Sequence, residues 1–151
     1  MLRERLGDAL KAAMKAKEKH KVSTLRLILA AIKDRDISSR ATVESDGISD
    51  GEILQLLAKM VRQRGESIKL YKRGGRVDLA AREAEEIVII EDFLPRQLDD
   101  AEIGAAIREA IEEVGATGLK DMGRTIAELK ARYAGQMDFA KASALVKQQL
   151  G

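Results

Sequence analysis

Apolar residues recur along nearly the whole chain with the 3.6-residue period of an α-helix. A first apolar stripe runs from Leu2 to Met14, and a charged segment follows over residues 15–21. A second helix is expected to begin at Ser23 or a neighbour. The polar and aperiodic stretch over 38–47 predicts a mobile loop. Since the alternation typical of strands is missing, the pattern predicts an all-α fold.

Start and stop signals predict two more helices before the single proline of the chain. Ser49, followed three residues later by Glu52, is a capping-box pattern that opens a long helix. That helix should end near the Gly74-Gly75 pair, because glycine favours the left-handed turn after a helix. Asp78 is expected to cap the next helix, which should stop near Phe93 because a proline restricts the residue before it.

The segment after the proline carries its own signals for three helices. Asp99 and Glu102 repeat the capping-box spacing, and Asp138 can cap the last helix. Glycines separate the apolar stripes in between. We therefore predict two domains, a helical N-terminal domain over 1–95 and a small three-helix C-terminal domain over 96–151.

Composition removes several classes of function. The chain has no cysteine and one histidine, so disulfides, thiol chemistry and histidine-rich metal centres are excluded. His20 is interpreted as a solvent-exposed residue near a helix end, and no nucleophile–base set accompanies it. Gly74-Gly75-Arg76 lacks the spacing of a phosphate-binding loop, and the glutamate clusters lack the Glu-x-x-His pattern of di-metal bundles. We expect no catalytic residue, no metal site and no cofactor.

Hydropathy gives an expectation about location. The sequence contains no run of 18 apolar residues, and its N-terminus alternates charged residues with leucine. We therefore expect neither a membrane span nor a signal peptide, no membrane partner, and a cytoplasmic location.

Charge is distributed unevenly along the chain, although the net charge is only +2. Lysine and arginine outnumber the acidic residues over 1–73, whereas acidic residues are in slight excess afterwards. A surface formed by the basic half of the chain can bind a polyanion, and it can also be an ordinary solvated face of a helical protein. Only Tyr71 and Tyr133 could stack on bases, so the pattern favours recognition of phosphates or shape over sequence readout.

Several short segments, in order, resemble the GatB/YqeY family, specifically the stand-alone YqeY-like proteins, over nearly the whole chain. These segments include Met14-Lys15, Leu25-Arg26, Gly74-Gly75-Arg76, Phe93-Leu94-Pro95 and Lys120-Asp121-Met122-Gly123. The resemblance implies a two-part all-α fold. It also implies a relation to the tail of the B subunit of the glutamine-dependent tRNA amidotransferase, where the tail helps to hold the tRNA and separate domains perform the chemistry.

On this basis the expected function is binding of tRNA or another structured RNA without a catalytic centre of its own. The alternative is a protein-interaction module of the translation machinery. A carbon–nitrogen ligase with glutamine as amido donor ranks last, because that label belongs to the larger enzyme. Six basic residues that match the family pattern are the candidate RNA contacts: Lys120, Arg124 and Lys147 in the second domain, and Lys33, Arg64 and Arg76 in the first.

The resemblance also leads to expectations for three further positions. The family usually has a basic residue after the glycine matched to Gly135, but Gln136 stands there in this chain. A phosphate contact at that position would be lost or reduced to a neutral hydrogen bond. We expect structural roles for Gly123, in close helix packing, and for Asp121, in capping or in the helix dipole.

Overall fold

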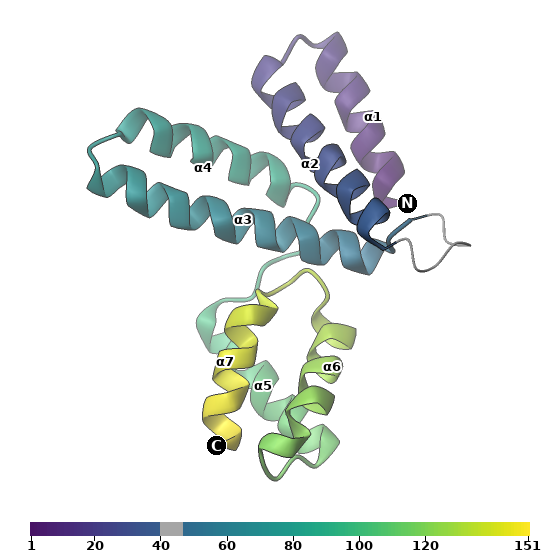
Figure 1. Cartoon of the computed structure of the whole chain (residues 1–151), viewed down its shortest axis with the longest axis vertical. Helices are drawn as coiled ribbons and strands as arrows, with labels where there is room; N and C mark the ends of the chain where they lie inside the picture. Colours follow the sequence, from purple (N-terminus) through teal and green to yellow (C-terminus); the bar gives the residue numbers. More distant parts are fainter. Residues whose placement is uncertain (40–46) are drawn as a thin grey trace. The chain divides into compact units, whose positions relative to one another are not determined.

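The computed structural model describes residues 1–39 and 47–151, which form seven α-helices and one short 3-10 helix (Figure 1). These residues contain no strand, and the all-α prediction is confirmed. Most of the loop predicted over 38–47 lies outside the described residues. None of the helices among the described residues has the length and apolar character that crossing a membrane requires.

The chain divides into two compact units, Met1–Pro95 and Arg96–Gly151. Each unit contains its own cluster of buried apolar side chains. Independent folding of these units as domains stays a prediction.

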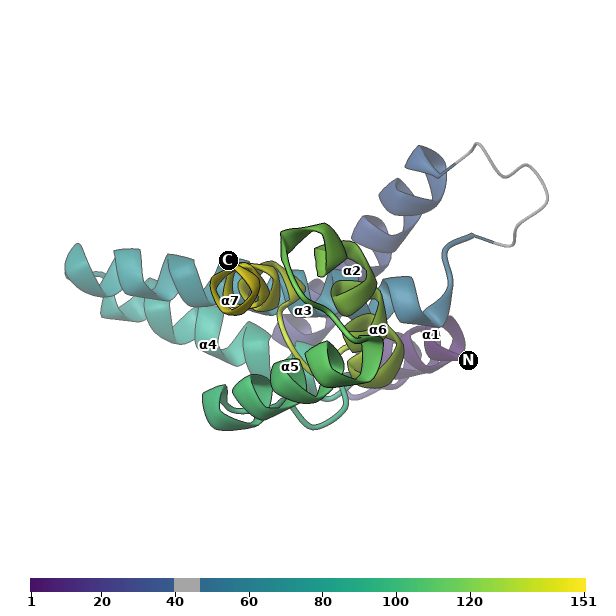
Figure 2. The same cartoon turned by 90° about the horizontal axis from the view of Figure 1, so that it is seen from below.

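The first unit consists of two helical hairpins (Figures 1 and 2). The helices are α1 (Leu2–Lys15), α2 (Lys19–Ser38), α3 (Asp50–Arg73) and α4 (Val77–Glu91). Helix α1 packs on α2, and α3 packs along α4. The core side chains that are fully buried are Leu6, Leu25, Ile28, Ile32, Ile53, Leu57 and Ile90.

The predicted boundaries of the long helix are confirmed. The Ser49 hydroxyl accepts a hydrogen bond from the Glu52 N–H at 3.2 Å, and the Glu52 carboxylate accepts one from the Ser49 N–H at 3.4 Å. The helix ends at Arg73, and Gly75 follows with a φ of 74°. This backbone angle is why glycine suits the turn.

Two predicted helix starts are wrong. Helix α2 begins at Lys19 rather than near Ser23, and its N-cap residue Glu18 makes no side-chain capping bond. Helix α4 begins at Val77, so Asp78 lies inside its first turn instead of at the N-cap. In both cases the preceding turn fixes where the helix begins, and no capping side chain marks the position.

The second unit contains α5 (Asp100–Val114), η1 (Leu119–Asp121), α6 (Met122–Tyr133) and α7 (Phe139–Leu150). The Asp99–Glu102 capping box is confirmed, and Asp138 caps α7 by accepting from the Ala140 N–H at 3.0 Å. The core comprises apolar residues from all three α-helices and the connection before α7. It includes Ile103, Ile107, Leu129, Met137, Ala142 and Val146.

Candidate nucleic-acid interface

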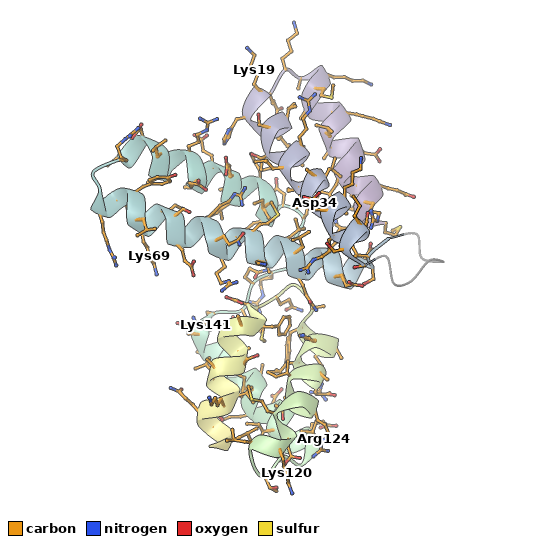
Figure 3. The ribbon with its side chains drawn as sticks, viewed as in Figure 1. Lys19, Asp34, Lys69, Lys120, Arg124 and Lys141 are labelled. Carbon is orange, nitrogen blue, oxygen red and sulfur yellow. The ribbon has the colours of Figure 1, made fainter. Side chains whose placement is uncertain are left out.

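Three of the six candidate contacts lie toward one end of the second unit. Lys120 belongs to η1, Arg124 to the first turn of α6, and Lys147 to the last turn of α7. Helix α6 runs away from η1 and α7 returns, so the C-terminal end of α7 lies toward the end at which α6 begins (Figure 1). Figure 3 shows Lys120 and Arg124 close together there. All three residues are exposed.

Asp121 fixes the position of Arg124. Its carboxylate accepts from the Thr117 N–H at 2.9 Å and from Arg124 Nη2 at 2.6 Å, and a second arginine nitrogen donates to the Val114 carbonyl at 3.1 Å. The bond from the Thr117 amide, and then the bond from Arg124, lower the pKa of Asp121 to about 2. Arg124 is thereby oriented while 61% of its side chain stays exposed.

Asp121 lies at the start of α6 as expected, and its interaction with the helix dipole stays a prediction, whereas side-chain capping by Asp121 is not observed. Asp121 occupies the N-cap position of α6, but its side chain accepts no hydrogen bond from a main-chain N–H of that helix. Its carboxylate instead accepts from the Thr117 N–H of the preceding turn and from the Arg124 side chain. Apart from its chain neighbours and the backbone of its own helix, no described atom lies within 4 Å of the place where a Cβ would stand on Gly123. The explanation of Gly123 by close helix packing is therefore wrong.

Gln136 stands away from this cluster of cations. It lies in the connection between α6 and α7, whereas Lys120 and Arg124 lie at the beginning of α6 (Figures 1 and 3). Its main chain is engaged on both sides: its N–H donates to the Tyr133 carbonyl and its carbonyl accepts from the Leu98 N–H, each at 2.9 Å. The neutral side chain therefore belongs to the other end of the unit.

Arg64, a candidate in the first unit, lies between α3 and α4. Its Nε is 2.9 Å from Glu86 Oε2 and 3.9 Å from Glu83 Oε2, and its Nη1 donates to the Met60 carbonyl at 3.3 Å. Only 15% of the side chain is exposed for both Arg64 and Glu86. Burial, followed by the neighbouring Glu86 charge, raises the pKa of Glu83 above its ordinary value. The guanidinium thus holds two helices together.

The other two candidates of the first unit are exposed and lie on different elements. Lys33 is on α2 and has no ion-pair partner among the described residues. Arg76 is in the turn between α3 and α4, where its Nε and Nη2 donate to both Asp78 oxygens at 3.2 and 3.1 Å. This turn is the end of the α3–α4 hairpin that lies far from α2 (Figure 1). The three candidates of the first unit therefore do not form one cluster.

The sequence-based interpretation of His20 needs correction. Its side chain is 29% exposed, and its buried Nε2 lies 3.4 Å from Glu85 Oε2 without a hydrogen bond. His20 is near a helix end as expected, but it is half-buried against α4 rather than solvent-exposed. Within the described ranges, no group of histidine and acidic residues is arranged to hold a metal ion.

Comparison with curated proteins finds fungal relatives. The protein named "Altered inheritance of mitochondria protein 41, mitochondrial" from Vanderwaltozyma polyspora is 28% identical over 124 residues, covering 78% of this chain and 64% of that protein. Its namesake from Lachancea thermotolerans is 31% identical over 111 residues, covering 72% of this chain and 57% of the relative. The chain thus spans less than two thirds of these relatives' length.

The names of these relatives contradict the cytoplasmic location expected from the sequence. That expectation rested on the lack of an apolar span and of a signal peptide. Neither property distinguishes the cytoplasm from another aqueous compartment, so the hydropathy argument could not support the conclusion.

The comparison with family models accounts for the segments that first suggested a relationship. The model described as "Yqey-like protein" matches residues 3–150, which include both structural units. Because the match extends over nearly the entire sequence, this chain belongs to the YqeY-like protein family.

Proposed function

We propose that this chain binds RNA, with tRNA as the expected class, through the end of the second unit that carries Lys120, Arg124 and Lys147. The observation that carries the proposal is the proximity of the exposed Lys120 and Arg124 at that end, toward which the last turn of α7 with the exposed Lys147 also runs. Lys120 and Lys147 have no ion-pair partner among the described residues, and Arg124 is oriented by Asp121. Cations of this kind bind phosphates and release the counterions of the nucleic acid.

Family membership supports the same function. The family resembles the tail of the tRNA amidotransferase B subunit, which helps to hold the tRNA. Lys33 and Arg76 are exposed and stay in the proposal as secondary contacts. Arg64 is assigned to the packing of α3 on α4, because its side chain is only 15% exposed and its guanidinium is paired with the equally buried Glu86.

The interface should contact phosphates more than bases. Tyr133 and Phe139, the aromatic residues of the second unit, are both partly buried against its core, which disfavours stacking on bases. Phosphate contacts position an RNA but carry little sequence information. We therefore expect modest discrimination among tRNAs of the same shape.

The test is a titration of labelled total tRNA at several salt concentrations. Replacing Lys120, Arg124 and Lys147 together with alanine should weaken binding and reduce the slope of log affinity against log salt by about two to three. The matched control replaces Arg108, Lys130 and Lys141, which removes the same charge elsewhere on the same unit and should change the slope by less than about one.

Two results would contradict the proposal. One is the absence of binding by the wild-type chain even at low salt. The other is an unchanged slope in a folded variant that lacks Lys120, Arg124 and Lys147.

A protein-interaction module is the second candidate function. Exposed apolar side chains on the α3–α4 hairpin favour it, since Leu70, Val77 and Val88 are each more than 60% exposed. Isolation of one protein partner that survives nuclease treatment, with no RNA affinity, would favour this candidate. Glutamine-dependent turnover by the purified chain would instead favour the ligase that ranks last.

A further inference from the structure

A surface pocket of about 450 Å³ lies at the turn between α1 and α2, and neither the fold nor the proposed RNA interface accounts for it. Its lining combines basic, hydroxyl and apolar side chains. These are Met14, Lys17, Lys19, Val22, Ser23 and Arg26. We propose that this pocket binds the phosphate group of a nucleotide, either a free mononucleotide or a nucleotide within an RNA chain.

The polar side chains of the pocket converge from one helix face and from the turn. Lys19, Ser23 and Arg26 follow the spacing that places residues on the same side of α2. Figure 3 shows Lys19 at the tip of the hairpin. All three are exposed, as is Lys17.

These groups are available to a ligand. In the part of the chain that the structure describes, Lys17, Lys19 and Arg26 form no ion pair, and the Ser23 hydroxyl has no hydrogen-bond partner. The acidic residue of the turn, Glu18, has its carboxylate 3.9 Å from Lys21 and lines a neighbouring pocket instead. Three cations and a hydroxyl are the donors that recognise phosphate.

The backbone at Lys17 gives an independent reason to assign its side chain a role. Lys17 has a φ of 57°, and it is the one non-glycine residue with a positive φ among the described residues. Its N–H donates to the Met14 carbonyl at 3.2 Å, and the Glu18 N–H donates to the Ala13 carbonyl at 3.0 Å. This pair of bonds ends α1 in a Schellman motif, with Lys17 at the position that favours glycine.

Two other helices of the chain end in the same motif with glycine at that position. They are α3, with Gly75 at a φ of 74°, and α5, with Gly115 at 65°. Lysine carries an energetic cost in this conformation that glycine avoids. Residues held in such conformations cluster at functional sites, and here the residue in the costly conformation is a lysine that lines the pocket.

The apolar part of the lining indicates an organic phosphate. Met14 is 50% exposed and Val22 is half-buried beside the cations. A thioether makes favourable contacts with aromatic rings, so Met14 can cover a base while the basic groups hold the phosphate. The site lies in the first unit and does not depend on RNA binding by Lys120, Arg124 and Lys147.

The test uses amide NMR spectra of the full chain titrated with adenosine monophosphate, adenosine, and a short oligouridylate with hydroxyl ends. Adenosine monophosphate or the oligouridylate should shift the amide signals of 17–23 saturably, whereas adenosine should not. Saturation by the mononucleotide supports a site for free nucleotides, and saturation by the oligouridylate alone supports a site for RNA phosphates.

Two matched double variants distinguish binding in this pocket from non-specific attraction to the positive charge of the surrounding surface. Lys17→Gly with Arg26→Ala should weaken binding by about tenfold, because it removes charge-assisted bonds and leaves a turn that glycine favours. Lys11→Ala with Lys15→Ala removes the same charge from α1 outside the pocket and should weaken binding by less than about twofold.

The proposal is overturned by equal shifts with adenosine and its monophosphate, by the absence of shifts with all three probes, or by equal weakening in the two variant pairs. The variant that lacks Lys120, Arg124 and Lys147 should retain the pocket signals. Failure of the pocket and failure of the RNA interface are thus distinguishable.

Discussion

Replacing Arg64 with alanine should destabilise the first unit strongly, although Arg64 matches a basic position of the family and was a candidate RNA contact. The guanidinium lies 2.9 Å from Glu86 Oε2 and 3.9 Å from Glu83 Oε2, and it spans the packing of α3 on α4. Its removal leaves two carboxylates close together without their cation.

The magnitude follows from the burial of the pair. Removing one partner of a fully buried ion pair costs about 3–5 kcal/mol, because the remaining charge is uncompensated. Arg64 and Glu86 are each 15% exposed, so water can solvate part of that charge. We expect the free energy of unfolding to fall by about 2–4 kcal/mol near neutral pH.

The pH dependence distinguishes this mechanism from a simple loss of packing. Burial and Glu86 raise the pKa of Glu83 above its ordinary value, and Arg64 opposes that rise. Without Arg64 the pKa of Glu83 should rise further. Ionising a carboxyl with a raised native pKa costs the folded state more than the unfolded state, so lowering the pH through that pKa should relieve part of the loss.

Urea denaturation followed by circular dichroism, near pH 7 and near pH 5, measures both effects. Lys69→Ala is the control, because Lys69 is an exposed cation on the same helix, and it should change stability by less than about 0.5 kcal/mol. The reasoning is refuted if Arg64→Ala behaves like the control, or if its stability loss is the same at both pH values.

Three further outcomes are expected. Lys17→Gly should raise the free energy of unfolding by up to about 1 kcal/mol, because glycine adopts the left-handed conformation of this position without strain, although it loses more backbone entropy on folding. A lower melting temperature of the variant would contradict this. The pKa values of Asp121 and Glu102 are lowered to about 2 from ordinary values of 3.8 and 4.5. The stability that each carboxylate confers is therefore complete above its ordinary pKa and is lost as the pH falls through about 2. Urea midpoints measured across that range should fall for the wild type and change less for Asp121→Asn with Glu102→Gln. A fragment comprising 96–151 should unfold cooperatively on heating when followed by circular dichroism, and a gradual, non-cooperative loss of helix would refute the prediction that it is a domain.

The parts of the fold that the sequence predicts correctly are those in which the interacting residues lie close together in the chain. The Ser49–Glu52 and Asp99–Glu102 boxes each join residues within one helical turn, so spacing alone identifies them. The start of α2 was misplaced because Glu18 makes no capping bond. The preceding turn gave no glycine signal either, since Lys17 occupies the position that glycine usually fills.

The candidate site was predicted by residue type but not by environment. Lys120 and Arg124 lie on adjacent elements, and their proximity follows from short spacing. The environment of Arg64 depends on Glu86, 22 residues further along the chain on another helix. Likewise, His20 is half-buried because Glu85 of α4 lies beside it. Such pairings depend on how the helices pack, which periodicity alone does not specify.

The main-chain bonds of Gln136 have an evolutionary consequence. Because its N–H and carbonyl, rather than its side chain, join it to Tyr133 and Leu98, many residues can occupy this position without changing the fold. A single substitution between glutamine and a basic residue would alter the charge of the surface at little cost in stability. Related chains can therefore diverge here in their affinity for anionic partners while retaining the same scaffold.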